Sequence, residues 1–440
     1  MHKLEMLIFQ NGERYPILMD RDGMPHFLAT LWVTAKLRSM GLTVNTISAR
    51  LAVLKWFFQW EIKEQRDLFS EFQQGQFLRD TDIDKIKSHL SIDIAHLKGL
   101  SSHKQTRNKI VGINSSPQLI KVTPSVGRNN IYNRLTAVAG YLDFIAKVAT
   151  QYTTNPSLTA EIKNMFQRLM AKRPKGKGNN VLRKIDDKNL PDGLIEEFMA
   201  VAHYDHPKNP FKHITTRKRN HLMFILLEEL GIRRGELLSL TMGANMQLFG
   251  PDKFIWVRRS HDDVNDHRKK QPVAKTRERM LPIKDETAKL IDEYIKNVRG
   301  KTPHSGKHGY LFITHHKCPS QGKPISVSTF DTIIVPAMKS VDERFKAIHP
   351  HYFRHHWNEM FSRKIDQHNK LAKDPNSNRI EITPGEEAKS RMHLMGHSSE
   401  SSAKPYIERH IRKKTNKLIL EEQEYFQRLL TTPQSNKESE

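Results

Sequence analysis

Residues 226–240 read LLEELGIRRGELLSL, and this stretch decides the fold of the C-terminal half of the chain. The pattern predicts an apolar helix that ends at Gly231 and a second helix that begins beside Arg233. A guanidinium at such an entrance stays charged at any working pH and can donate two hydrogen bonds to two oxygens of one phosphate. Glu236 would hold the local backbone or a neighbouring donor, although Arg and Glu at this spacing are most often a surface ion pair.

The next candidate lies between two β-prone runs, FIWV (254–257) and RMLPI (279–283), which we expect to pair as a hairpin. Lys275 stands just before the second run, in KTRERMLPI, so the hairpin would hold it on one arm. A lysine ammonium on its long side chain can give a proton to a leaving alkoxide. The competing candidates are Lys269, Lys270 and Arg277, and any of these could equally be a simple anion contact.

A histidine and an arginine share a predicted helix face in AIHPHYFRHHWNEMF (347–361). Pro350 suits a first helical position, and His351 and Arg354 follow three residues apart. A histidine with a pKa near neutrality can exchange a proton with a nucleophile, and the arginine adds a second positive charge. Metal binding is the alternative, because His349, His351, His355 and His356 crowd the segment. Neither a cysteine nor an HExxH pattern accompanies them, so we expect no metal.

The fourth candidate is Tyr406, which follows Gly396 and His397 in RMHLMGHSSESSAKPYIERH (391–410). A phenol with a pKa of about 10 is a poor nucleophile unaided. Attack on a phosphodiester would therefore need nearby cations and a proton acceptor. A lone tyrosine on an amphipathic helix is more often a residue at the rim of a core. The order Arg, Lys, His-x-x-Arg, Gly-His, Tyr favours instead a phosphate site with a nucleophile.

The whole chain is strongly basic: 72 Lys and Arg against 48 Asp and Glu give a formal charge of +24 over 440 residues. Such an excess favours a polyanionic partner through counterion release, although solubility alone is an alternative explanation. A membrane surface is not expected to be the partner, because the sequence shows no amphipathic basic helix or polybasic tail. The single cysteine, Cys318, excludes a disulfide framework within the chain and fits a reducing cytoplasm.

The chain length predicts two or three domains. Residues 1–24 read as a short β-prone appendage with a turn at Asn11-Gly12, and residues 25–170 as a helical bundle. In that bundle, TVNTISARLAVLKWFFQWEI (43–62) places Ile47, Leu51, Leu54, Phe58 and Ile62 on one face. We expect a basic linker at 171–184, an α+β, mostly helical domain with a small antiparallel sheet at 185–432, and a disordered tail at 433–440.

Together, GIRRGEL, HPHYFRH, MGHSS and the nine-residue step from His397 to Tyr406 resemble the tyrosine recombinase, or phage integrase, family. The resemblance covers the C-terminal domain, which would be the catalytic domain. The N-terminal lobe is similar only in pattern to the family's helical core-binding (SAM-like) domain, through residues 43–60 and 134–147. The resemblance implies two lobes that clamp double-stranded DNA.

The resemblance also implies roles for the residues that would hold and protonate the DNA. Arg233 and Arg354 would clamp the scissile phosphate and its transition state. His351 would accept a proton or bind the phosphate, and Lys275 would be the general acid.

The remaining roles concern the nucleophile and its support. Tyr406 would form a 3′-phosphotyrosyl bond, His397 would donate to a non-bridging oxygen, and Glu236 would support its neighbours without reacting. No metal, nucleotide or other cofactor is implied, because the covalent link conserves the free energy of the broken bond.

The sequence departs from the family in three places. Lys275 stands seven residues before Pro282, where family hairpins are often longer and carry glycine. His356 and Trp357 replace smaller residues, and 364–389 read as an insertion without an assigned role.

The stretch KLILEEQEYFQRLL (417–430) predicts an amphipathic C-terminal helix. In this family such a helix can dock on a neighbouring protomer, so we expect a homo-oligomer, a tetramer, on DNA; packing on its own domain is the alternative. Accessory DNA-bending proteins are further candidate partners.

The expected function is site-specific recombination, as the integrase of a mobile element. No run reaches 18 apolar residues and the N-terminus lacks the apolar core of a leader, so we expect a cytoplasmic, nucleoid-associated protein outside the membrane. The alternatives are a type IB topoisomerase-like enzyme that nicks and reseals DNA with the same residues, and a DNA-binding protein with an inert site.

Overall fold

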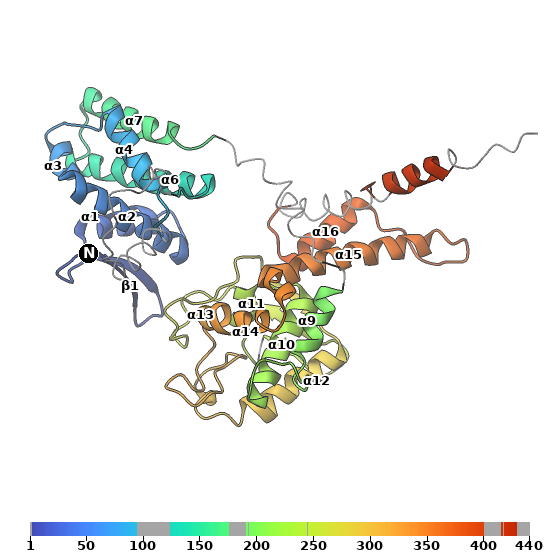
Figure 1. Cartoon of the computed structure of the whole chain (residues 1–440). Helices are drawn as coiled ribbons and strands as arrows, with labels where there is room; N and C mark the ends of the chain where they lie inside the picture. Colours follow the sequence, from blue (N-terminus) through green and yellow to red (C-terminus); the bar gives the residue numbers. More distant parts are fainter. Residues whose placement is uncertain are drawn as a thin grey trace, which may run out of the picture. The chain divides into compact units, whose positions relative to one another are not determined.

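The computed structural model describes residues 2–94, 124–175, 191, 193–243, 245–399, 415–416 and 418–428. The chain divides into two units, residues 1–184 and 185–440, whose α-helices are labelled in Figure 1. Each unit has a hydrophobic core of its own. Over the described residues, every helix is too short or too polar to cross a membrane.

The first unit begins with an antiparallel hairpin of β1 (Lys3–Ile8) and β2 (Arg14–Met19). The helical segments that follow are α1 (Phe27–Trp32), the π-helical η1 (Val33–Arg38), α2 (Val44–Glu64), α3 (Leu68–Gln73), α4 (Asp80–Ser91), α6 (Arg128–Ala149) and α7 (Pro156–Ala171). Helix α6 packs against α1, α2, α3, α4 and α7, so it is the central helix of this unit.

Apolar spacing along α2 builds much of this core. Ile47, Leu51, Leu54 and Phe58 are buried, as their spacings of three and four residues predict. Ile62, which the same spacing placed on this face, is 50% exposed. Each step of four residues advances about 40° past a full turn, so the apolar stripe drifts away from the core by the last turn of the helix.

The N-terminal hairpin shares the core of the helices. Tyr15, Ile17 and Leu18 of β2 are buried there, and β2 packs along α2. The sequence pattern alone predicts a separate appendage over residues 1–24. The structure instead joins the hairpin to the helical unit, because β2 buries apolar side chains that an isolated hairpin would leave in water.

The second unit is mainly helical and contains one small sheet. Strands β3 (Met246–Gln247), β4 (Phe254–Val257) and β5 (Arg279–Pro282) are antiparallel neighbours in that order. Its longer helices are α9 (Leu194–Ala202), α10 (Ile214–Leu230), α12 (Asp285–Glu293), α15 (Pro350–Ala372) and α16 (Pro384–Met395). The shorter segments are α11 (Arg234–Ser239), η2 (Tyr294–Arg299), η3 (Ser305–Lys307), α13 (Val327–Thr329), η4 (Phe330–Ile334), α14 (Val335–Lys339) and η5 (Glu343–Ala347).

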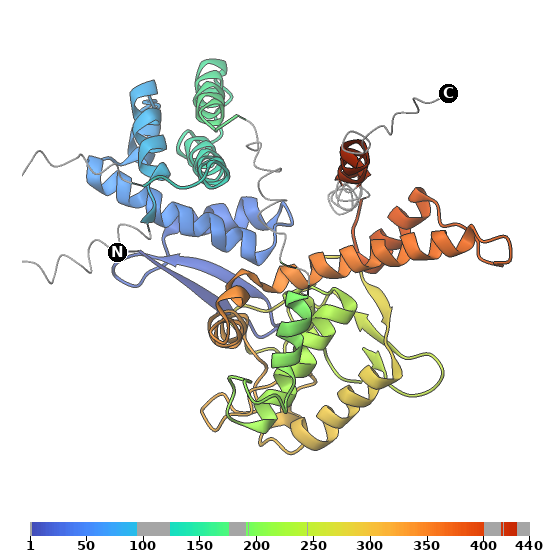
Figure 2. The ribbon, with the colours of Figure 1, turned by 45° about the vertical axis from the view of Figure 1, so that its right-hand side comes forward.

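Helix α10 forms the centre of this unit and packs against α9, α12 and α15. Long α15 projects from the unit, and the chain turns back along it as α16, as Figure 2 shows. The side-chain amide of Asn369 pairs with both backbone groups of Ile382 and closes this turn. The segment 364–389 is therefore a helical hairpin.

The expected fold class, α+β and mostly helical with a small antiparallel sheet in the C-terminal part, is confirmed. Residues 176–184 of the expected linker, the tail at 433–440 and Tyr406 lie outside the described residues. The individual domain boundaries and the core-binding role of the first unit stay predictions.

Candidate active site

The turn after α10 places Arg233 at the end of a buried helix. Helix α10 stops at Gly231, whose φ of +57° lies in the left-handed region that favours glycine. A Cβ at Gly231 would lie 2.8 Å from the indole of Trp357, so a larger residue does not fit. Helix α11 begins directly afterwards, and Arg233 is its N-cap residue with 32% of its side chain exposed.

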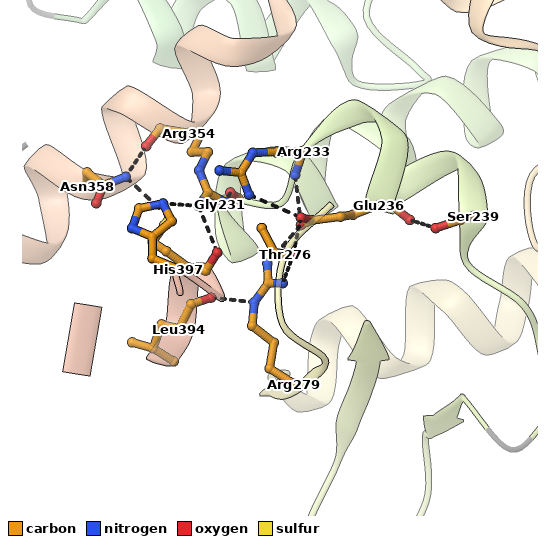
Figure 3. Close-up of polar contacts among 11 residues, drawn as sticks. Gly231, Arg233, Glu236, Ser239, Thr276, Arg279, Arg354, Asn358, Leu394 and His397 are labelled. Carbon is orange, nitrogen blue, oxygen red and sulfur yellow. Dashed lines mark hydrogen bonds and ion pairs between the residues drawn. The ribbon is translucent and has the colours of Figure 1, made fainter. Parts of the chain in front are cut away.

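The carboxylate of Glu236 accepts hydrogen bonds from three segments of the chain (Figure 3). Arg233 donates from its backbone N–H at 3.1 Å and from Nη1 at 3.3 Å. Thr276 Oγ1 and Arg279 Nη2 each donate at 2.8 Å. Glu236 is 1% exposed, so these bonds replace the water that a carboxylate requires.

The pKa of Glu236 reflects two opposing effects. Burial alone would raise the pKa, but the charge and hydrogen bond of Arg279, the charge of Arg354 and the hydrogen bond of Thr276 together lower it below its usual value. Glu236 is therefore ionised at neutral pH and supplies the negative charge among these arginines.

Arg279 is a site residue that the sequence motifs did not single out. It is 4% exposed, and its Nη1 donates to Thr276 Oγ1 at 2.9 Å while its Nε donates to the backbone oxygen of Leu394 at 2.6 Å. Strand β5 alternates buried and exposed residues, which puts Arg279 on the same face as Leu281. A charge on the buried face of a strand needs a partner, and that pattern was the available signal in the sequence.

Arg354 lies on α15 and is fully buried. Its Nη1 donates to the backbone oxygen of Gly231 and its Nη2 to that of Met395, both at 2.9 Å. The same Nη2 lies 3.1 Å from Nε2 of His397. One guanidinium thus joins the end of α10 to the end of α16, as Figure 3 shows for Gly231, Arg354 and His397.

Gly396 ends α16 and sets the position of His397. Its φ is +64°, and a Cβ there would lie 2.8 Å from Arg277 O, Arg279 Nη1 and Thr276 Cβ. The backbone N–H of Arg277 donates to Gly396 O at 2.9 Å. Only glycine combines this backbone conformation with so close an approach to the β4–β5 connection.

His397 is 6% exposed and neutral at physiological pH. Burial, followed by the charges of Arg354, Arg233 and Arg279, lowers its pKa to about 4. Arginine only donates hydrogen bonds, so Nε2 of His397 is the acceptor and the ring proton resides on Nδ1. A negatively charged ligand at this position would favour protonation of the ring.

A second buried arginine holds α16 against α15. Arg391 is fully buried and donates to the backbone and side-chain oxygens of Asn358 at 2.9 Å. It also contacts Ser362 and forms an ion pair with Glu387 at 2.5 Å. Asn358 in turn donates to the backbone oxygen of Arg354 at 2.7 Å. This cluster fixes the helix that leads into the turn carrying His397.

Two expected site residues lie at the surface beside this buried group. Lys275 is exposed, but its neighbours Ala274 and Thr276 are buried, so the backbone at Lys275 is held next to the Glu236 carboxylate. His351 is exposed on α15, one turn before Arg354, and its ring lies 4.5 Å from that of His355. Tyr406 lies outside the described residues.

The histidines crowded at the start of α15 raise the alternative of a metal site. Among the residues that the structure describes, no three His, Cys, Asp or Glu side chains converge on a common point. His356 lies 3.9 Å from Glu228. Trp357, the other departure from the family pattern, packs on Gly231 and donates to the backbone oxygen of Glu229 at 2.9 Å.

The charges of the site are unequal. The guanidiniums of Arg233, Arg279 and Arg354 face one carboxylate, Glu236, while His397 is neutral, which leaves a surplus of positive charge in a mostly buried setting. Electrostatic interactions are stronger where water is excluded. The arrangement can therefore bind a phosphate and stabilise the extra negative charge of a pentacoordinate phosphorane.

Comparison with known proteins gives one family. Residues 193–369 match the model of the phage integrase family. Tyrosine recombinase XerD of Halalkalibacterium halodurans is 29% identical over 169 residues, which cover 38% of this chain and 47% of that protein. The chain thus spans about half the length of this curated relative.

Two solved structures of the XerH site-specific recombinase were also found. The post-cleavage complex with palindromic difH substrate gives a TM-score of 0.42 at 13% identity, covering 90% of this chain and 96% of that one. The pre-cleavage complex with difH substrate gives a TM-score of 0.37 at 15% identity, covering 86% and 91%.

Proposed function

We propose that the protein is a site-specific DNA recombinase that cuts and rejoins DNA through a covalent phosphotyrosyl intermediate. The premise is that residues 193–369 match the model of the phage integrase family. The observation that carries the proposal is the group of partly exposed Arg233 with buried Arg354 and His397, which has a surplus of positive charge. Such a group is matched to a phosphodiester, which gains negative charge in its transition state.

In the proposed cleavage step, the phenol oxygen of Tyr406 attacks the scissile phosphorus. The bond from phosphorus to the 5′ oxygen breaks, and the 3′ phosphate stays on the tyrosine. His351 accepts the phenol proton, and Lys275 protonates the departing 5′ oxygen. Rejoining reverses these steps, with the 5′ hydroxyl of the same or another strand as the nucleophile, so no bond energy has to be supplied from outside.

The remaining site residues bind the phosphate or support the residues that do. Arg233, partly exposed at the entrance of α11, faces the phosphate directly, and His397 donates to a non-bridging oxygen through Nδ1–H. Buried Arg354 adds its positive charge next to His397 and orients that ring through Nη2. Glu236 keeps Arg233 and the β4–β5 connection in place and takes no part in proton transfer.

Double-stranded DNA is the proposed partner. The formal charge of +24 supports binding to a phosphate backbone, in which the first unit would take part as a DNA-binding domain. Leu420, Tyr425 and Phe426, in helical residues 418–428, are exposed, which supports assembly of protomers, as a tetramer, through this helix. Accessory DNA-bending proteins would act on the assembled complex.

The experiment that tests the proposal traps the intermediate. The protein is incubated with a supercoiled plasmid library of genomic fragments in EDTA, and SDS-stable protein–DNA adducts are captured and their ends sequenced. Adducts that share one sequence support a site-specific recombinase. If the protein binds DNA but forms no adducts with or without EDTA, the inert DNA-binding alternative is favoured. If adducts form without EDTA but not in its presence, a metal-dependent reaction is favoured.

A second assay separates recombination from nicking and resealing. Two duplexes that carry the mapped site are mixed with the protein, and exchanged strands are scored beside relaxation of a supercoiled plasmid. Joined duplexes are expected for a recombinase, whereas relaxation without joining is the result for a type IB topoisomerase-like enzyme. The narrower proposal, integration of a mobile element, predicts that the mapped ends coincide with the borders of such an element.

A further inference from the structure

We propose that Arg279 is a positioning residue for DNA cleavage, which holds the segment carrying Lys275 and the turn carrying His397 on the same carboxylate, that of Glu236. The inference rests on the proposed function. It concerns a residue of β5 outside the motifs that identify the family-like site.

Three atoms of the Arg279 guanidinium reach three different parts of the chain. Nη2 donates to Glu236 of α11, Nη1 to Thr276 of the β4–β5 connection, and Nε to the backbone oxygen of Leu394 near the end of α16. Because the Arg279 side chain is only 4% exposed, its hydrogen bonds are made to protein groups. A planar fork of fixed geometry is suited to holding three partners at once.

The contacts of Arg279 lie close in sequence to Lys275 and to His397. Thr276 immediately follows Lys275, and its hydroxyl also donates to Glu236 at 2.8 Å. Leu394 lies three residues before His397, and the intervening Gly396 packs so closely that an added Cβ would lie 2.8 Å from Arg279 Nη1. Movement of Arg279 would therefore shift the general acid and the histidine together.

A second hydrogen bond joins the same two segments. The backbone N–H of Arg277 donates to Gly396 O at 2.9 Å. This bond joins the backbones alone, whereas Arg279 links both of them to the carboxylate that also caps Arg233. The proposed role of Arg279 is thus to couple three parts of the site, with no contact to the reacting atoms.

Arg299 provides a matched control in the same unit. It is also 4% exposed and donates to backbone oxygens of Tyr310, Ser305 and His308. None of these residues belongs to the Glu236, Arg354 and His397 group. Arg299→Lys therefore reports the general effect of replacing a buried arginine fork.

The test compares full-length wild type, Arg279→Lys, Arg279→Gln and Arg299→Lys on the site mapped from trapped adducts. Single-turnover adduct formation and DNA affinity are measured for each, with thermal unfolding as the measure of stability. We expect Arg279→Gln to lose about 100-fold in cleavage rate, as for misplaced reacting groups. Arg279→Lys should lose about 10-fold, because it keeps the charge but not the fork. DNA affinity should change less than threefold, roughly, because Arg279 is buried.

A second readout reports on His397 directly. The histidine resonances are followed by NMR as a function of pH. The resonance of His397 is assigned as the one that is missing from the spectrum of His397→Gln. Because the positive charge of Arg279 contributes to the lowered pKa of His397, Arg279→Gln should raise that pKa while Arg299→Lys leaves it unchanged. Loss of the charge raises this pKa whether or not Arg279 positions the site, so Arg279→Lys, which keeps the charge, reports position. A changed His397 pKa in Arg279→Lys supports the positioning role, whereas an unchanged pKa with a lower melting temperature would contradict it.

The outcomes separate the two proposals. If wild type forms no adduct, the proposed function fails. If wild type forms adducts and folded Arg279→Lys and Arg279→Gln keep the wild-type rate, the positioning role is wrong. It is equally wrong if Arg299→Lys loses as much rate at a similar loss of melting temperature, since the effect would then follow stability alone.

Discussion

Nη2 of Arg354 lies 3.1 Å from Nε2 of His397, although 43 positions separate the two residues in the sequence. The contact requires a neutral histidine ring, because a protonated ring would direct a second donor at the guanidinium. Both side chains are buried, so the position of each depends on the other. The chemistry proposed for this chain therefore depends on a pair of side chains whose positions are set by the C-terminal ends of α10 and α16.

Replacing Arg354 with lysine should uncouple these helix ends. Lysine has one ammonium and cannot donate to Gly231 O, Met395 O and His397 in the same geometry. We expect Arg354→Lys to lower the rate of adduct formation by about 10²–10³, the usual effect of losing one transition-state donor. Single-turnover cleavage measures it. Arg363→Lys, an exposed substitution on the same helix, should retain the wild-type rate, and an equal loss there would contradict the prediction.

Gly396→Ala should displace His397. The new methyl group would meet Arg277 O and Thr276 at 2.8 Å, and the positive φ adds backbone strain. The expected loss is about 2–4 kcal/mol in the free energy of unfolding, from left-handed strain and overpacking together. Gly385→Ala in the same helix has open space and is the control, with an effect within about 0.5 kcal/mol. Similar losses of unfolding free energy for the two variants, measured by urea unfolding, would contradict the close approach at Gly396.

Glu236→Gln should destabilise the second unit more than removal of its hydroxyl partner does. The amide leaves Arg279 buried without its counter-charge, and breaking a buried ion pair on one side costs about 3–5 kcal/mol. Thr276→Val removes the hydroxyl that donates to this carboxylate and accepts from Arg279 Nη1, and the loss of these two hydrogen bonds should cost about 2 kcal/mol. Urea unfolding of both variants gives the comparison, and the reverse order would contradict the assignment of Glu236 as the central carboxylate.

Acid should weaken the second unit through its buried histidines. Burial, with the charges of Arg219 and Arg299, lowers the pKa of His315 to about 3, compared with 6.5 for an unperturbed ring. The unfolded chain therefore binds this proton first, so the stability contribution is complete above about pH 6.5 and is lost as the pH falls toward 3. The slope should be about 1.4 kcal/mol per pH unit for this residue.

A variant isolates this contribution from those of other groups. His315→Gln can still bond to Tyr294 and Thr302 but cannot titrate. The difference in unfolding free energy between wild type and the variant should change by about 1–2 kcal/mol from pH 7 to pH 5. A difference that is independent of pH would mean that His315 is not held neutral by burial.

Sequence reasoning found the parts of the site that depend on local signals. Gly231 and Gly396 end helices, and each precedes a residue that the motifs had selected, Arg233 and His397. Gly231 and Arg233 could be placed because a helix end and its glycine follow from neighbouring residues. The motif selected Gly396 and His397 without predicting that a helix ends there. The strands at 254–257 and 279–282 likewise follow from local β-prone composition.

The remainder depends on contacts that are distant in the sequence. Arg279 reaches Glu236 across 43 residues and Leu394 across 115, and no spacing rule predicts such partners. Trp357 looked like a departure from the family pattern, whereas the structure shows that it fills the space above Gly231. Ile62 was misplaced because steps of four residues turn the apolar stripe away from the core by the last turn of α2.

The central claim is that Tyr406 is the nucleophile, and mass spectrometry of the trapped adduct tests it most directly. The adduct is digested with nuclease and trypsin, and the peptide at 392–409 is sequenced by fragmentation. We predict a nucleotide phosphate on Tyr406 and, in parallel, no adduct from Tyr406→Phe protein that still binds the same DNA. A nucleotide on any other residue, or an adduct that persists in Tyr406→Phe, would contradict the account.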